Sequence, residues 1–316
     1  MPALSDNPSV VVLGGGTGLA TLLSGLKHHT SDLTAVVTVA DDGGSSGRLR
    51  REMGIQPPGD IRNCLVALAE DESLMGRLFQ YRFEEGTLSG HSFGNLFLAA
   101  LTKVTDDFEE AVHLSSKILK TCGTVLPASP DSVWLKAELA DGRTVEGQSA
   151  IAGSDSACRR IWLQPKNTRP TKAVLEAIAR ADIIVTGPGS LFTSIIPNLL
   201  IDGIAEAIAA ATCPRVFVCN VMTQPGETIG FSAADHLEAL IAHTRPGIVD
   251  TVIVNTAEPP APIVEFYRAK GALPVTPDTD RLAELDVRVV TAEVASGGNY
   301  FRHDSDKLAA AITLLL

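Results

Sequence analysis

The segment 37–48, VTVADDGGSSGR, places two adjacent carboxylates after a β-branched run and before five residues with little or no side chain. Carboxylates there could accept hydrogen bonds from sugar hydroxyls, hold a hard cation that bridges phosphates, or cap a solvated loop. A neighbouring arginine suits a ligand with both hydroxyls and phosphates, because the acids bind the hydroxyl donors and the guanidinium binds the anion. The candidate binding residues of this segment are Asp41, Asp42, Ser45, Ser46 and Arg48.

A glycine-rich turn connects an apolar run at 9–13 to a helical pattern at 19–27. Glycines at this position let the backbone approach a phosphate and direct the amide groups of a helix N-terminus toward it. The G-x-G-x-x-G spacing fails because Leu19 stands at the third glycine position, and no Gly-Lys-Ser/Thr of a P-loop follows. Nucleotide binding is therefore favoured, with NAD binding a third interpretation. The candidate contacts are Gly14, Gly15, Gly16, Thr17 and Gly18.

Four more polar segments open or follow predicted elements. QPPGDIRN and GHSFGN open helices, whereas GPGSLFTS and CNVMTQPGET each follow an apolar strand. Loops of this kind meet beyond the carboxyl ends of parallel strands, so we expect one ligand site. Arg302 follows the last predicted strand and is a candidate for the anionic part of the ligand. The other candidates are Asp60, Arg62, Asn63, His91, Asn95, Gly187, Gly189, Ser190, Ser194, Asn220, Thr223 and Gln224.

The stretch 90–94, GHSFG, matches the G-x-S-x-G motif of hydrolases that use a serine nucleophile. That motif requires a buried strand directly before the serine, and residues 84–89 are polar and loop-like. Ser92 is therefore predicted to open a helix, and none of these motifs by itself assigns a catalytic residue.

Buried strands must alternate with helices to bring these residues together. Strands are predicted at 9–13, 33–39, 182–186, 215–219, 251–255 and 287–290, with helices of 10 to 15 residues between most of them. Alternation at 133–139, an Asp-Gly turn and a return at 144–151 predict an antiparallel excursion. The fold class is α/β, with a doubly wound, mostly parallel sheet and an antiparallel excursion near 124–163. We expect one domain over 1–316, with a glycine-loop half to about 123 and a second half from about 164.

Composition limits the class of protein. The 316 residues are 45% hydrophobic, enough for a large core, and the net charge of −11 argues against nucleic acid and anionic membranes as partners. No 18-residue apolar window predicts a membrane span, and the N-terminus lacks the basic region of a secretory signal. Five scattered cysteines without metal-site spacing are typical of a reducing compartment. We expect a cytoplasmic protein.

Six motifs in this order resemble those of one family: GGGTGL, TVADDGGSSGRLR, PPGDIRNCLVALA, GHSFGNLFLAAL, GPGSLFTSIIPNLL and CNVMTQPGET. They resemble the gluconeogenesis factor family (YvcK-like), which belongs to the 2-phospho-L-lactate transferase (CofD-like) superfamily. The resemblance implies a Rossmann-like cytoplasmic protein that binds a UDP-sugar, UDP-N-acetylglucosamine or UDP-glucose. It also implies a role in cell shape and wall synthesis during gluconeogenic growth, with cell-wall synthesis proteins as candidate partners.

The transferase branch of the superfamily implies a second hypothesis. Those enzymes move a phospholactyl group from a nucleotide diphosphate donor to a deazaflavin with magnesium, but they lack the GGSSGRLR continuation after Asp42. The first hypothesis is a UDP-sugar-binding regulator that needs no cofactor, with Asp41 and Asp42 near sugar hydroxyls or a cation. The alternative is a magnesium-dependent transferase in which Asp42 holds the metal and acts in catalysis. A homo-oligomer is compatible with both.

Overall fold

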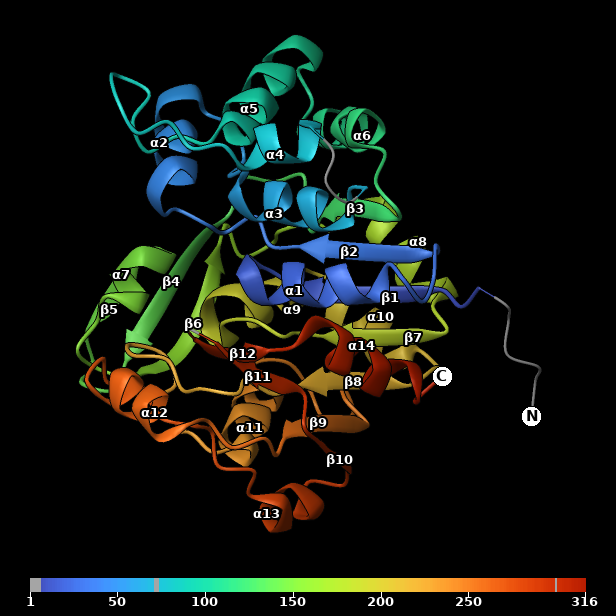
Figure 1. Cartoon of the computed structure of the whole chain (residues 1–316), viewed down its shortest axis with the longest axis vertical. Helices are drawn as coiled ribbons and strands as arrows, with labels where there is room; N and C mark the ends of the chain where they lie inside the picture. The colour runs from blue at the N-terminus through green and yellow to red at the C-terminus, as the bar shows by residue number, and fades with distance from the viewer. Residues whose placement is uncertain (1–6, 71–73, 299) are drawn as a thin grey trace.

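The computed structural model describes residues 7–70, 74–298 and 300–316. Seven parallel strands form the central sheet in the order β10-β9-β8-β7-β1-β2-β3 (Figure 1). The chain leaves β1 toward β2 and β3 and later returns to the other side of β1 at β7, so the strand order reverses between β1 and β7. The strand bounds are β1 Val10–Gly14, β2 Leu33–Val37, β3 Thr124–Pro127, β7 Ile183–Thr186, β8 Arg215–Val218, β9 Thr251–Asn255 and β10 Arg288–Ala292.

Helices cover both faces of this sheet, which explains why its central strands are almost uninterrupted Val, Ile and Leu. On one face the core is formed with α1 (Gly16–Leu26), α3 (Gly59–Leu68), α4 (Leu74–Gln80), α5 (Phe93–Thr105), α6 (Phe108–Leu119) and α14 (Ser305–Thr313). On the other face the core is formed with α8 (Lys172–Arg180), the π-helical turn η1 (Leu191–Ile195), α9 (Ile196–Leu199), α10 (Ile204–Ala210), α11 (Ala233–His243) and α13 (Thr279–Glu284).

A separate antiparallel sheet lies at the carboxyl end of the central strands, toward which the β2 and β8 arrows point in Figure 1. It consists of β4 (Trp134–Leu139), β5 (Thr144–Glu146) and β6 (Cys158–Gln164). The predicted doubly wound fold with an antiparallel excursion is confirmed. The excursion begins later than predicted, because Thr124–Pro127 pairs in parallel with β2 as the edge strand of the central sheet.

One local prediction was wrong. The strand predicted at 144–151 ends at Glu146, because Gly147 turns the backbone with φ of 95° and α7 (Gln148–Ala152) follows. The glycine and serine residues after Asp42 form the first turn of helix α2 (Gly44–Met53), in place of the solvated loop that was one of the alternatives. Small residues tolerate this crowded turn, where a Cβ at Gly47 would overlap the Asp42 carbonyl.

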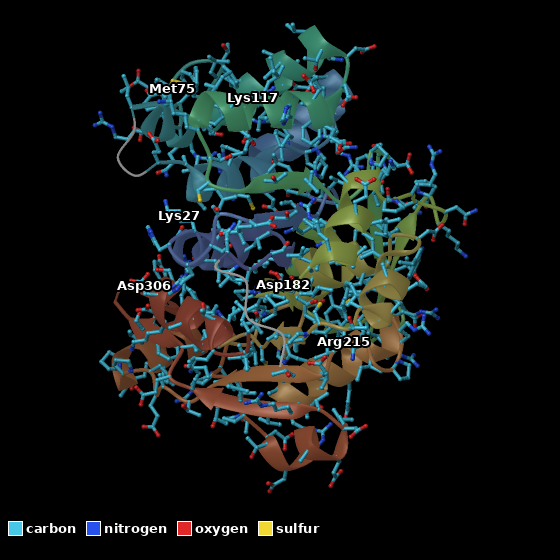
Figure 2. The ribbon with its side chains drawn as sticks, turned by 90° about the vertical axis from the view of Figure 1, so that its right-hand side faces the viewer. Lys27, Met75, Lys117, Asp182, Arg215 and Asp306 are labelled. Atoms are coloured by element: carbon cyan, nitrogen blue, oxygen red, sulfur yellow. The ribbon has the colours of Figure 1, made fainter. Side chains whose placement is uncertain are left out.

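The remaining elements lie near the C-terminal end of the chain. Helix α12 (Ala261–Arg268) buries none of its residues. A hairpin of β11 (Ala295–Gly297) and β12 (Phe301–His303) packs beside it. The two are joined by the Tyr267 hydroxyl, which donates to the Phe301 carbonyl at 3.2 Å. In Figure 1 both lie at the carboxyl end of the sheet. Figure 2 looks onto the opposite end, where Asp182 and Arg215 mark the starts of β7 and β8.

In the described parts of the chain, no single helix is both long and apolar enough to cross a membrane. One apolar pair, Leu191–Leu199 with Ile204–Ala210, passes that test only together and is bent by 76°. Residues 1–6, to which most of the N-terminal signal prediction refers, lie outside the described residues.

The contact between α1 and α14 generates the first prediction. A Cβ on Gly25 would overlap the Ser305 carbonyl, so Gly25→Ala is expected to destabilise the fold by about 1–3 kcal/mol through overpacking. Gly298→Ala is the matched control, because a Cβ there meets nothing within 4 Å. Urea unfolding of both variants measures the difference, and equal stabilities would contradict the close α1–α14 contact.

Candidate functional site

The loops after β1, β7 and β8 meet at the point where the strand order reverses, as expected for ligand sites of such sheets. Between them lies a pocket of about 420 Å³, which we call the switch-point pocket. Predicted residues from four separate segments line it: Gly15, Gly16, Thr17, Gly18, Gly189, Ser190, Ser194, Asn220, Thr223, Gln224 and Arg302.

The glycine loop makes contacts that only glycine permits. A Cβ on Gly15 would lie 2.7 Å from an Asp60 carboxylate oxygen, and a Cβ on Gly18 would lie 2.9 Å from the Pro188 carbonyl oxygen. Gly16 has φ of +66° and begins α1. Its backbone amide donates a hydrogen bond to the Asp60 carboxylate, which lies behind the pocket. The loop after β1 is thus packed directly against the loop after β7. Gly14 belongs to β1 and does not line the pocket.

The loop after β8 holds the loop after β7 through side-chain hydrogen bonds. The Gln224 amide donates to the Ser190 hydroxyl at 2.8 Å, and the Gly189 amide donates to Asn220 at 3.4 Å. The buried Glu227 carboxylate accepts from the Phe192 amide at 3.2 Å and from the Thr193 hydroxyl at 2.9 Å. It thereby satisfies amide groups at the start of η1, where such groups lack partners within the helix. Gly187 precedes this loop and does not line the pocket.

Buried acids lie behind both loops. Burial raises the pKa of Glu227 to about 7, against the lowering effect of its hydrogen bonds. Burial also raises the pKa of Asp60 to about 7, and the nearby Asp41 carboxylate contributes in the same direction. The pKa of Asp41 is itself raised by burial, although the Gly43 amide and the Ser46 hydroxyl bond to it. Asp41 and Asp60 are therefore close enough to act on each other electrostatically.

Two cationic side chains line the mouth of the pocket. Lys270 Nζ lies 4.1 Å from the centre of the Phe266 ring, and Arg302 Cζ lies 4.7 Å from that of Tyr300. In the described structure neither cation has a carboxylate within ion-pair distance. Sequence analysis missed Lys270, because it follows an exposed helix and belongs to no motif. It also missed the apolar lining residues Met222, Tyr267 and Phe301.

The remaining predicted residues do not line the pocket. Asp42 accepts hydrogen bonds from the Ser149 amide at 2.9 Å and its hydroxyl at 3.0 Å, and so binds the start of α7. The Ser46 hydroxyl oxygen accepts a hydrogen bond from the Gly59 backbone amide at 3.0 Å. The rest, which surround the first turns of α2, α3 and α5, are Ser45, Arg48, Arg62, Asn63, His91 and Asn95.

Ser92 opens α5, as predicted. Its hydroxyl accepts from the Asn95 amide at 3.3 Å as the helix N-cap, and the residue is fully buried. A serine in this position satisfies a backbone donor and is not presented to the switch-point pocket.

Comparison with known proteins places the chain in a family. The model for 2-phospho-L-lactate transferase CofD matches residues 10–295. The gluconeogenesis factor of Bacillus subtilis is 47% identical over 99% of both chains, and that of Halalkalibacterium halodurans is 50% identical over 96% of this chain and 95% of the other. The chain belongs to the CofD family, in its gluconeogenesis factor branch.

A solved structure supports the fold of this gluconeogenesis factor branch. A crystal structure of a Bacillus halodurans protein is 49% identical and superposes with a TM-score of 0.94, covering 97% of this chain and 99% of the other. The family resemblance expected from the six motifs is thus confirmed.

The buried Glu227 generates a pH prediction. Its pKa of about 7 in the fold exceeds about 4.3 in an unfolded chain, so between these pH values only the folded chain keeps the proton. The free energy of unfolding should therefore decrease as pH rises through that window. Glu227→Gln should make this decrease shallower, and the exposed Glu265→Gln on α12 should not. Urea unfolding at several pH values measures both slopes, and an unchanged slope for Glu227→Gln would contradict the raised pKa.

Proposed function

We propose that this chain is a cytoplasmic UDP-sugar-binding factor that supports cell shape and wall synthesis during gluconeogenic growth. The name gluconeogenesis factor, carried by relatives at 47% and 50% identity, supports the growth condition. The switch-point pocket supports the ligand class. Five free cysteines in the described structure suit a reducing compartment. UDP-N-acetylglucosamine and UDP-glucose are the proposed ligands, and cell-wall synthesis proteins are the proposed partners.

One observation carries the ligand assignment: two loops rich in small residues and two cations without ion pairs line the same pocket of a chain with net charge −11. The start of α1 and the loop 187–194 offer backbone amides and hydroxyls to a diphosphate. Lys270 and Arg302 add positive charge at the mouth. The negative charge of a diphosphate is thus balanced by donors and cations within the pocket, although the chain as a whole is acidic.

The other half of the pocket suits a ring. Met222, Tyr267 and Phe301 supply apolar and aromatic surface, while Asn220 and Thr223 supply polar groups next to it. Pockets for small molecules commonly combine such apolar lining with a few polar groups that fix orientation. A diphosphate joined to a base and a sugar matches both halves.

Removing either cation tests the proposal. Lys270→Ala and Arg302→Ala should each weaken UDP-sugar binding by about 1.5–3 kcal/mol, the range for hydrogen bonds to charged groups. Lys307→Ala, an exposed lysine on α14, is the charge-matched control and should bind like wild type. Calorimetric titration with UDP-N-acetylglucosamine, UDP-glucose, GDP and NAD measures the affinity for each and shows which class of nucleotide the protein binds. Wild-type affinity in both pocket variants would exclude this pocket as the binding site.

The second candidate function is a magnesium-dependent transferase on a nucleotide diphosphate ester, favoured by the CofD model match. Asp41 and Asp60 fit a hard cation better than Asp42 does, because their carboxylates act on each other electrostatically whereas Asp42 is bound to Ser149. In the described residues no group of three or more His, Cys, Asp or Glu side chains forms a metal cage. Magnesium held by Asp41 and Asp60 would therefore use ligand and water oxygens as well, and would neutralise phosphate charge.

Metal removal separates the two functions. In a binding factor, UDP-sugar affinity should be the same in EDTA and in magnesium, and Asp42→Asn should change it little because Asp42 contacts α7. In a transferase, EDTA and Asp60→Asn should both abolish conversion of a nucleotide diphosphate ester. Calorimetry and mass spectrometry of the products measure the two outcomes. Product formation that stops in EDTA would overturn the binding-factor proposal, and metal-independent binding without product would overturn the transferase.

A further inference from the structure

Three arginines from different elements lie together outside the switch-point pocket. Arg48 is on α2, Arg62 is on α3, and Arg82 forms a bridge with Ser92 ahead of α5. Burial lowers the pKa of Arg62, and the nearby Arg82 lowers it further. Burial lowers the pKa of His91 as well, with Arg48 and Arg82 contributing. We call Arg48, Arg62 and Arg82 the arginine cluster, two members of which act on His91.

Backbone carbonyls hold two of these guanidinium groups in place. Arg48 Nη2 donates to the Ser89 carbonyl at 2.8 Å, and Arg82 Nη1 donates to the Gly90 carbonyl at 2.6 Å. Gly90 has φ of +82°, and a Cβ there would lie 3.0 Å from Arg48. The glycine therefore allows Arg48 to approach, and the loop orients both arginines before any ligand arrives.

The positive charge of the cluster is not balanced by ion pairs. No carboxylate of the described residues lies within ion-pair distance of Arg48, Arg62 or Arg82. The acids that act on the cluster electrostatically are Asp60, which acts on Arg62, and Glu52, which acts on His91. Like charges repel one another, so holding three arginines together in a chain of net charge −11 is unfavourable without an anion.

Buried polar groups at the same place also lack partners. Arg62 Nε and Asn95 Oδ1 have no hydrogen-bond partner, and Asn95 is only 2% exposed. The side-chain amide of Asn95 donates to the Ser45 hydroxyl at 3.1 Å. The same hydroxyl is hydrogen-bonded to His91 Nδ1 at 2.8 Å. The hydrogen bond to Ser45 engages Nδ1 of His91, and among the described residues its Nε2 makes no hydrogen bond.

We propose that the arginine cluster, with His91, is a second binding site that takes a compact oxyanion of a small molecule, a phosphate or a polycarboxylate. Guanidinium groups bind such anions through paired, charge-assisted hydrogen bonds. The three guanidinium groups offer only hydrogen-bond donors, whereas a sugar or a base would also need acceptors. The site is distinct from the switch-point pocket, whose lining includes none of these residues. It does not depend on the proposed UDP-sugar function.

The test measures anion binding with the switch-point pocket disabled. Inorganic phosphate, pyrophosphate and citrate are titrated by calorimetry at constant ionic strength into wild type and into Lys270→Ala/Arg302→Ala. At least one of these anions should bind both proteins, and the preference between pyrophosphate and citrate distinguishes phosphate from carboxylate ligands. Adding Arg48→Ala/Arg82→Ala should weaken that binding at least tenfold, whereas Arg245→Ala, an exposed arginine after α11, should not.

Thermal unfolding shows whether each variant is folded. If Arg48→Ala/Arg82→Ala is unfolded, the single variant Arg82→Glu tests the proposal instead. The Arg82 side chain is exposed, so this variant should fold, and the reversal of its charge should also weaken anion binding at least tenfold. Two results would overturn the proposal: binding that is equal in wild type and the folded arginine variants, or no binding of any of the three anions. Failure of UDP-sugar binding would leave this result unaffected, because the titration of the pocket-disabled protein does not use that ligand.

Discussion

The loops after β1 and β7 depend on two buried carboxylates that accept hydrogen bonds from their backbone amides. Glu227 binds the first amide groups of η1, and Asp60 binds the amide of Gly16 at the start of α1. Burying a carboxylate is costly unless hydrogen bonds or protonation compensate, and both groups have pKa values raised to about 7. Two of the loops that line the switch-point pocket, those after β1 and β7, are thus held by carboxylates that do not line it.

Close packing at the switch point imposes a second constraint. Gly15 and Gly18 bring the loop after β1 against Asp60 and Pro188, and side chains there would separate the loops. The pocket therefore has walls of backbone and small side chains on one side, while α12 and the β11–β12 hairpin supply its aromatic and cationic side. An acidic chain can bind an anion in this way because the favourable field is local.

The short helix α7 connects the antiparallel sheet to two segments at the carboxyl edge of the central sheet, one after β2 and one after β8. Asp42 binds the start of α7, and Gly226 packs against the Ile151 and Ala152 carbonyls near its end. Glu227, which holds η1, is the next residue after Gly226. The segment that follows the two aspartates is therefore linked through α7 to the segment that positions the loop after β7. Asp42 has a structural partner for this reason, although its sequence context suggested a ligand contact.

The sequence by itself determined the alternation of strands and helices, the doubly wound class and the family, because apolar periodicity, glycine turns and motif order are local properties. It also predicted that the segments at 14–18, 187–194, 220–224 and Arg302 would share one edge, since strand ends in a parallel sheet meet there. Local sequence pattern could not separate the candidate binding residues into those that line the switch-point pocket and those that lie outside it. Only the tertiary structure placed Asp42 on α7, brought Asp60 within the electrostatic range of Asp41, brought Lys270 to the pocket and gathered Arg48 and Arg82 near His91. These contacts join residues far apart in the chain, and their distances follow from how helices pack across the sheet.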